Sequence, residues 1–302
     1  MGVLDSIGNT PLVKLETLKT NPRVRVFAKL EGNNPGGSVK DRIAYYMIKD
    51  AEETGRIKKG DTILEATSGN TGIGLAMVGA ALGYKVVLVM PECVSLERRK
   101  VLEAFGAELI LSPGNEGTDG AIKLARRMMD ESYGKYFMPN QFDNPANILA
   151  HYETTGQEII DQTNGEIDVF VAGMGTTGTL MGAGKRLKEF NRNIRVVGVE
   201  PFLGHKIQGL KNMQESIVPK IFNPAFPDEI VKVNDDDAFA TTRRLALQEG
   251  IFAGMSSGAA VFGALTMAGR IERGTVVVVL PDRGDRYLST ALFTSVCAKC
   301  PP

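Results

Sequence analysis

A lysine stands directly after a Pro-Gly-Gly-Ser turn, in the stretch NNPGGSVKDR at residues 33–42. Lys40 falls on the expected first turn of a helix, where the dipole and the unpaired backbone N–H groups favour anions and disfavour cations. The residues alone leave three interpretations open. Lys40 reaches solvent, it holds a phosphate, or it is kept neutral for covalent chemistry as a Schiff-base lysine.

Three loops rich in Gly, Ser and Thr fall at the ends of expected strands: TSGNT at 67–71, GMGTTGT at 173–179 and GMSSG at 254–258. In open α/β sheets, ligands bind outside the carboxyl ends of the strands. The first loop suits a carboxylate, or it is a plain helix cap. Ser256 and Ser257 either cap the helix that follows them or direct a neutral hydroxyl into the cleft.

The second loop satisfies G-x-G-x-x-G at residues 173–178, and Glu200 follows near the place of a ribose-binding acid. This pattern is typical of a dinucleotide site. The hydroxyls of Thr176, Thr177 and Thr179 instead suit a phosphate monoester, which offers three oxygens to hydrogen bonds at a helix start. The loop alone leaves both hypotheses open.

The composition of the 302 residues excludes several classes of protein. The 35 Lys and Arg balance the 35 Asp and Glu, so no net charge recruits nucleic acid or an anionic membrane. No apolar run approaches the ~20 residues that span a bilayer, and the first residues do not resemble a secretion signal. Three cysteines are too few for a disulfide framework, so a cytoplasmic protein is expected.

Predicted strands alternate with predicted helices along the chain. Continuous apolar strands, rather than alternating ones, indicate parallel sheets covered on both faces. The sequence therefore predicts an α/β fold of two units that meet near residue 145. The predicted strands are 24–30, 62–66, 85–90, 108–112, 168–173, 194–201 and 275–281, and the predicted helices are 41–55, 72–83, 95–106, 120–132, one after 179, and 236–250.

Five ordered motifs resemble those of the O-acetylserine sulfhydrylases, or cysteine synthases: NNPGGSVKDR, EATSGNTGIGLA, NQFDNPAN, GMGTTGTLMG and EGIFAGMSSGAA. These are fold type II pyridoxal-phosphate enzymes, with cystathionine β-synthase and threonine dehydratase as relatives. The resemblance implies two open twisted sheets flanked by helices, of the tryptophan synthase β type, with the active site in the cleft between them. It also implies a smaller mobile domain at 37–144 and a larger phosphate-binding domain of 1–36 plus 145–302.

The same resemblance implies a role for each motif residue. Lys40 would carry pyridoxal phosphate as an internal aldimine and serve as the general base. Asn70 would bind the cofactor's 3′ oxygen, and Ser256 would face its pyridine nitrogen. The residues expected to hold the phosphate are Gly175, Thr176, Thr177, Gly178 and Thr179. The residues expected to bind the substrate carboxylate are Thr67, Ser68, Thr71 and Gln141.

The implied reaction is a β-replacement that makes L-cysteine from O-acetyl-L-serine and sulfide or another sulfur donor, through an aminoacrylate. The tail DRGDRYLST at 282–290 resembles the B-type enzymes. Lys211 stands where relatives that accept O-phospho-L-serine carry arginine. It therefore either extends the enzyme to that substrate or is a solvated lysine on a mobile loop. The alternatives are a cystathionine β-synthase or related lyase, an NAD-binding oxidoreductase, and a non-catalytic binding protein.

The remaining expectations concern partners and metals. A homodimer is expected, and a stable complex with serine acetyltransferase is not, because B-type enzymes generally form none. Cys297 and Cys300 form a C-x-x-C without further ligands, so reduced thiols are expected rather than a zinc site. His151 and His205 stand in no ligand pattern.

Overall fold

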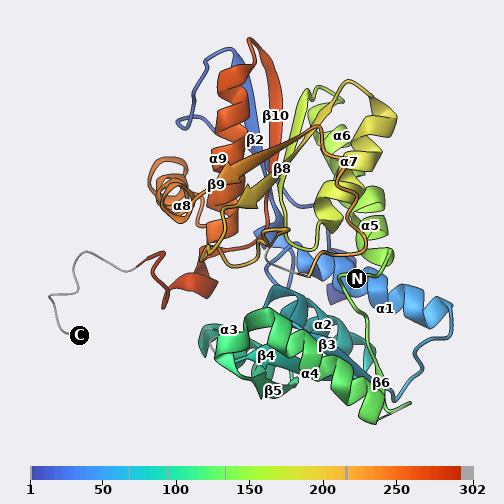
Figure 1. Ribbon diagram of the computed structural model, residues 1–302. Coiled ribbons are helices and arrows are strands. Elements are labelled where there is room, and N and C mark those ends of the chain that lie inside the picture. The colour runs from blue at the N-terminus through green and yellow to red at the C-terminus, as the bar shows by residue number, and fades with distance from the viewer. Residues whose placement is uncertain are drawn as a thin grey trace, which may run out of the picture.

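The computed structural model describes residues 2–67, 69–92, 94, 96–132, 134–214 and 217–293, and among these it contains two separate sheets (Figure 1). Ser68, Cys297 and Cys300 lie outside the described residues. The smaller sheet has the order β5 (Glu108–Ser112), β4 (Lys85–Pro91), β3 (Thr62–Ala66) and β6 (Tyr136–Phe137). The larger has the order β1 (Leu12–Lys14), β2 (Val24–Leu30), β10 (Gly274–Leu280), β7 (Val169–Gly173), β8 (Arg195–Pro201) and β9 (Glu229–Val233).

Neighbouring strands pair in parallel throughout both sheets, except that β1 runs antiparallel to β2 at one edge. The predicted parallel α/β fold is therefore confirmed. The longer helices are α1 (Lys40–Glu53), α2 (Asn70–Leu82), α3 (Leu96–Ala104), α4 (Gly117–Glu131), α5 (Ala146–Ala150), α6 (Gly156–Thr163), α7 (Gly178–Phe190), α8 (Asp235–Glu249) and α9 (Met255–Arg270). Short helical turns are η1 (Val3–Ser6), η2 (Glu31–Asn33), η3 (Gly114–Glu116), the π-helical η4 (His151–Thr155) and η5 (Gly284–Tyr287).

The central strands of the large sheet are buried on both faces, which explains why β7 and β10 are apolar along nearly their whole length. Along β10, Val276 and Val278 pack into the core on the side of α8 and α9. Val277 and Val279 pack into the opposite core, on the side of α6 and α7. Figure 1 shows these two helical layers on either side of the sheet. The small sheet is covered in the same way, by α1 and α2 on one face and α4 on the other.

Some elements were not predicted. β1 and β6 are edge strands of three and two residues, too brief for a periodic signal, and the edge strand β9 alternates exposed and buried residues instead of forming a continuous apolar run. The prediction also placed no helix between 146 and 163, where α5, η4 and α6 run on from one another. The motif loops themselves join strand to helix as expected, since 67–69 link β3 to α2 and 174–177 link β7 to α7.

The Pro-Gly-Gly-Ser turn before α1 is held against the end of the chain. Gly37 has φ +82°, and a Cβ there would overlap the guanidinium of Arg286, so the turn requires glycine. Ser38 forms an antiparallel bridge with Asp282, just after β10. This contact fixes the place where α1 begins and therefore the place of Lys40.

In the described part of the chain no helix is long and apolar enough to cross a membrane. Over the same residues, no three or more His, Cys, Asp or Glu side chains gather as they would around a metal ion.

Candidate active site

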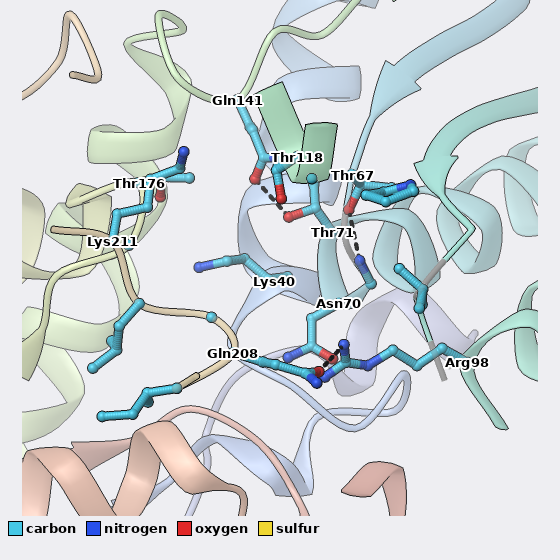
Figure 2. Close-up of a pocket in the computed structure, with 18 of the residues that line it drawn as sticks. Lys40, Thr67, Asn70, Thr71, Arg98, Thr118, Gln141, Thr176, Gln208 and Lys211 are labelled. Atoms are coloured by element: carbon cyan, nitrogen blue, oxygen red, sulfur yellow. Dashed lines mark hydrogen bonds between the residues drawn. The ribbon is translucent and has the colours of Figure 1, made fainter. Parts of the chain in front are cut away.

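A cavity of about 490 Å³ opens where the carboxyl ends of β3 and β7 face one another. Its walls come from loops and helices that follow strands of the two sheets and from the segment 205–211 (Figure 2). Most residues predicted for the site line it, namely Lys40, Thr67, Asn70, Thr71, Gln141, Gly175, Thr176 and Lys211. Thr177, Gly178, Thr179 and Ser256 do not line this cavity, although they belong to the segments around it.

Lys40 is half-buried, and Figure 2 shows its amine reaching into the middle of the cavity. Burial lowers the pKa of Lys40 to about 8, although the negative charges of Asp282 and Glu31 oppose the shift. A lysine with this pKa carries an appreciable neutral fraction near neutral pH. Its position excludes the interpretation of an ordinary lysine extended into solvent.

Asn70 is the first residue of α2, yet its side chain is held by the far end of the sequence. Its Nδ2 donates to Asp282 Oδ2 at 2.6 Å, and Arg286 donates to its Oδ1. Tyr287 donates its hydroxyl to the same Asp282 oxygen at 2.5 Å. The amide is therefore fixed in one orientation at the edge of the cavity.

Thr67, Thr71 and Gln141 meet on the small-sheet side of the cavity. Thr71 Oγ1 donates to Gln141 Oε1 at 2.6 Å (Figure 2). Thr67 Oγ1 accepts hydrogen bonds from the backbone N–H groups of Gly69 and Gly72, at 3.1 and 3.3 Å. Thr67 therefore caps backbone N–H groups at the start of α2 while it also lines the cavity, so its capping contacts do not exclude a role in ligand binding.

The start of α7 has the features of an anion site. Thr177 has φ +70°, a strained conformation for a β-branched residue, and its buried hydroxyl has no hydrogen-bond partner among the described residues. A Cβ at Gly175 would overlap the carbonyl oxygen of Gly209, and one at Gly178 would overlap Asn147 Oδ1. An unpartnered hydroxyl beside the free N–H groups of a helix start fits a phosphate group.

Two side chains behind this loop were not singled out by the sequence. Asn147 donates its Nδ2 to Gln141 O at 2.8 Å and to Thr176 Oγ1 at 3.1 Å, so one buried amide joins the two halves of the site. His151 Nε2 lies 3.2 Å from Thr179 Oγ1. Burial, together with the charge of Arg42, lowers the pKa of His151 to about 3, so the imidazole is neutral at neutral pH.

Ser256 and Ser257 lie in the first turn of α9, after Met255, and both are buried. A Cβ at Gly209 would lie 3.6 Å from Ser256 Oγ, which puts this serine directly behind the segment 205–211. The hydroxyl of Ser257 has no hydrogen-bond partner among the described residues.

Further polar residues of the cavity were missed. Arg98 donates to Gln208 Oε1 at 2.6 Å, a contact that Figure 2 shows, and its guanidinium lies 4.9 Å from the ring centroid of Tyr287. Asp119, in the first turn of α4, also lines the cavity. No sequence signal separates these residues from the other charges of two amphipathic helices.

Lys211 is not a solvated lysine. Its side chain is 13% exposed, and its Nζ lies 5.0 Å from the ring centroid of Phe142 and 3.8 Å from Asp119 Oδ1. Its backbone N–H donates to Met174 O at 2.8 Å. Burial lowers the pKa of Lys211, against the attraction of Asp119.

Glu200, the proposed ribose acid of a dinucleotide site, has another task. Its carboxylate accepts the N–H of Met213 at 2.7 Å and pairs with Lys232. It thus anchors the segment that carries Lys211. The dinucleotide hypothesis loses the residue on which it depended.

The sequence profile of the family described as "Pyridoxal-phosphate dependent enzyme" matches residues 3–282, so the chain belongs to this family, whose cofactor is pyridoxal phosphate. Within it, the chain is similar to the cysteine synthases. It is 49% identical to cysteine synthase from Aquifex aeolicus, over 97% of this chain and 92% of that protein. It is 49% identical to cysteine synthase B from Escherichia coli, over 95% of this chain and 94% of that protein.

A solved structure agrees with these relatives. The crystal structure of cysteine synthase from Entamoeba histolytica superposes with a TM-score of 0.92 at 42% identity, and covers 97% of this chain and 90% of that one. The predicted fold type is confirmed.

Proposed function

We propose that this protein makes L-cysteine from O-acetyl-L-serine and sulfide in a pyridoxal-phosphate-dependent β-replacement. The observation that carries the proposal is the position of Lys40, whose amine reaches into a cavity between a hydroxyl-rich carboxylate site and a helix start suited to phosphate. The similarity to cysteine synthases along nearly the whole chain supports the same reaction.

The cofactor would be held at both ends. Its phosphate would lie at the start of α7, on Gly175, Thr176, Thr177, Gly178 and Thr179, where the hydroxyl of Thr177 lacks a partner among the described residues. Lys40 would hold its carbonyl carbon, Asn70 its ring oxygen, and Ser256 its pyridine nitrogen. When bound, pyridoxal phosphate supplies the electron withdrawal that makes the substrate's α-proton acidic.

The protein's own groups then bind the substrate and move the proton. The hydroxyl of Thr67 and the amide Nε2 of Gln141 offer donors to the substrate carboxylate. Thr71 would add a third when its hydroxyl turns from Gln141 Oε1 to the substrate, and Ser68 is a fourth expected donor. Lys40 Nζ accepts the α-proton, because burial keeps part of the amine neutral near pH 8. A serine at the pyridine nitrogen, rather than a carboxylate, would favour loss of the β-substituent over transamination.

The test supplies purified holoenzyme with O-acetyl-L-serine and sulfide, and follows the formation of cysteine. We expect turnover by the wild type and its loss in Lys40→Ala. Replacing sulfide with homocysteine tests the alternative, because a cystathionine β-synthase would form cystathionine at a comparable kcat/KM. A wild-type holoenzyme that forms no cysteine would refute the proposal.

Lys211 is proposed as a donor-binding residue that admits O-phospho-L-serine beside O-acetyl-L-serine. Its support is an ammonium group held in the cavity wall on Phe142, away from bulk solvent. We expect Lys211→Ala to lower kcat/KM for the phosphorylated donor about tenfold more than for the acetylated one. An unchanged ratio would remove this role.

The organisation of the protein is also a proposal. A mobile domain of 37–144 against the rest is supported by the strand content of each sheet, with 62–137 in one and 12–30 plus 169–280 in the other. We propose a cytoplasmic homodimer, a location that its three cysteines favour. We expect it to form no stable complex with serine acetyltransferase. Light scattering and co-purification test these last two points.

A further inference from the structure

Positively charged side chains outnumber negatively charged ones in the lining of the cavity. Among the described lining residues, four are cationic, Lys40, Arg98, Lys206 and Lys211, whereas Asp119 is the single carboxylate. Asp119 stands in the first turn of α4, on the side of the small sheet, where the helix dipole favours a negative charge. It therefore places a carboxylate in the wall of a cavity whose other charged side chains attract anions.

The partner of Asp119 comes from the opposite wall. Lys211 belongs to the segment that follows β8 of the large sheet, and its Nζ lies 3.8 Å from Asp119 Oδ1. Lys211 is fixed by its backbone hydrogen bond to Met174 and by the ring of Phe142, with 13% of its side chain exposed. Asp119 is more open, with 36% of its side chain exposed.

This ion pair should affect two kinds of amino-acid donor to different extents. A donor with a neutral ester at its β-oxygen should bind almost equally well whether or not Asp119 offsets the positive charge of Lys211. A donor with a phosphate must compete with Asp119 for Lys211 and, as a dianion, is repelled by the carboxylate itself. The repulsion acts inside the cavity, where screening by solvent is weaker than at the surface.

We propose that Asp119 determines specificity by opposing dianionic donors, so that the enzyme favours neutral acyl esters of serine. The inference rests on the proposed function, since it concerns the donor of that reaction. Asp119 takes no part in the proton transfer. It reduces the positive charge of the cavity wall that would face the β-substituent of the donor.

The test measures binding without turnover, by calorimetry on the holoenzyme. One probe is the phosphonate in which CH₂ replaces the ester oxygen of O-phospho-L-serine, and the other is L-glutamine, a neutral amide of the same length as O-acetyl-L-serine. Neither has an oxygen leaving group on its β-carbon. Asp119→Asn is expected to tighten phosphonate binding about tenfold and to change glutamine binding less than about twofold.

Asp130→Asn is the matched control, because it removes the same charge from an exposed position of α4 that does not line the cavity. It should leave both dissociation constants unchanged. Asp119→Ser, which also suits a helix start, repeats the measurement if the asparagine variant folds poorly. Unchanged phosphonate binding in both Asp119 variants, equal tightening of both probes, or an equal effect of Asp130→Asn overturns the inference.

Turnover is measured beside binding, so that the two failures can be separated. If the inference is correct, Asp119→Asn raises kcat/KM for O-phospho-L-serine relative to O-acetyl-L-serine. If the wild type turns over neither donor, the proposed function fails, while the two probes still decide what Asp119 does.

Discussion

The amine of Lys40 should be a far stronger nucleophile near neutral pH than an ordinary lysine. Its pKa falls from 10.5 to about 8 because the amine is buried. Only the neutral amine can attack the carbonyl carbon of pyridoxal phosphate. The rate at which the cofactor-free protein takes up its cofactor should therefore follow the titration of this one group.

The size of the effect follows from the two pKa values. At pH 7, a lysine of pKa 10.5 is about 0.03% neutral, whereas one of pKa 8 is about 10% neutral. The difference corresponds to about 300-fold in the concentration of the reactive form. Raising the pH from 6 to 8 should speed uptake by about fiftyfold, and the rate should level off above pH 9.

The assay strips the cofactor, mixes the protein with a small excess of pyridoxal phosphate and follows its visible absorption between pH 6 and 10. Lys40→Ala is the control, and it should bind the phosphate without the covalent change in the spectrum. A rate that still climbs tenfold per pH unit at pH 9.5 would show an unshifted amine. That result would refute the argument from burial.

Two further predictions concern stability and cofactor retention. Glu158 lies in a buried cluster with Arg42 and Lys29, and although burial alone would raise its pKa, these cations lower it to about 2. Because the pKa is depressed in the folded state, this stabilisation is present above the unfolded value of 4.5 and is lost as pH falls towards 2. In urea titrations, Glu158→Gln should thus lower the free energy of unfolding by about 2–3 kcal/mol at pH 7 and by less at pH 4. The control Glu166→Gln, on the surface, should lower it by under about 1 kcal/mol. Equal losses of stability in the two variants would contradict the role of the buried cluster. Thr177→Val should leave the cofactor-free protein at least as stable as the wild type, because the lost hydroxyl is buried without a partner among the described residues. The same variant should bind the cofactor about tenfold more weakly. A destabilised cofactor-free protein with unchanged cofactor affinity would contradict the phosphate assignment.

The motif loops were readable from the sequence because their chemistry is local. A hydroxyl-rich turn between an apolar strand and a helix specifies a helix start with free N–H groups, wherever the element lies. The strands 24–30, 62–66 and 108–112 were predicted at their observed bounds, since the first alternates along its length and the other two are short β-rich runs. The sequence also singled out Lys40, because a cation at a helix start is unfavourable beside the positive end of the helix dipole.

The edge strands and the partners of the site residues could not be read in this way. β9 pairs with β8 at the edge of the sheet, and its charged residues Glu229 and Lys232 interrupt the apolar run that marks a central strand. Asn147 is one amide among many, and its importance comes from the two loops that fold onto it. Glu200 fits a dinucleotide pattern, and only its contacts with Met213 and Lys232 show that it anchors a loop.

The sequence by itself determined the fold class, the loops that carry the chemistry and the unusual position of one lysine. The tertiary structure alone decided the charge and the shape of the cavity. Lys211 and Asp119 are far apart in the chain, and each looks like an ordinary surface charge until two sheets bring them within 3.8 Å of one another. Burial and the distance between charges set pKa and selectivity, and both are properties of the folded chain that no single segment contains.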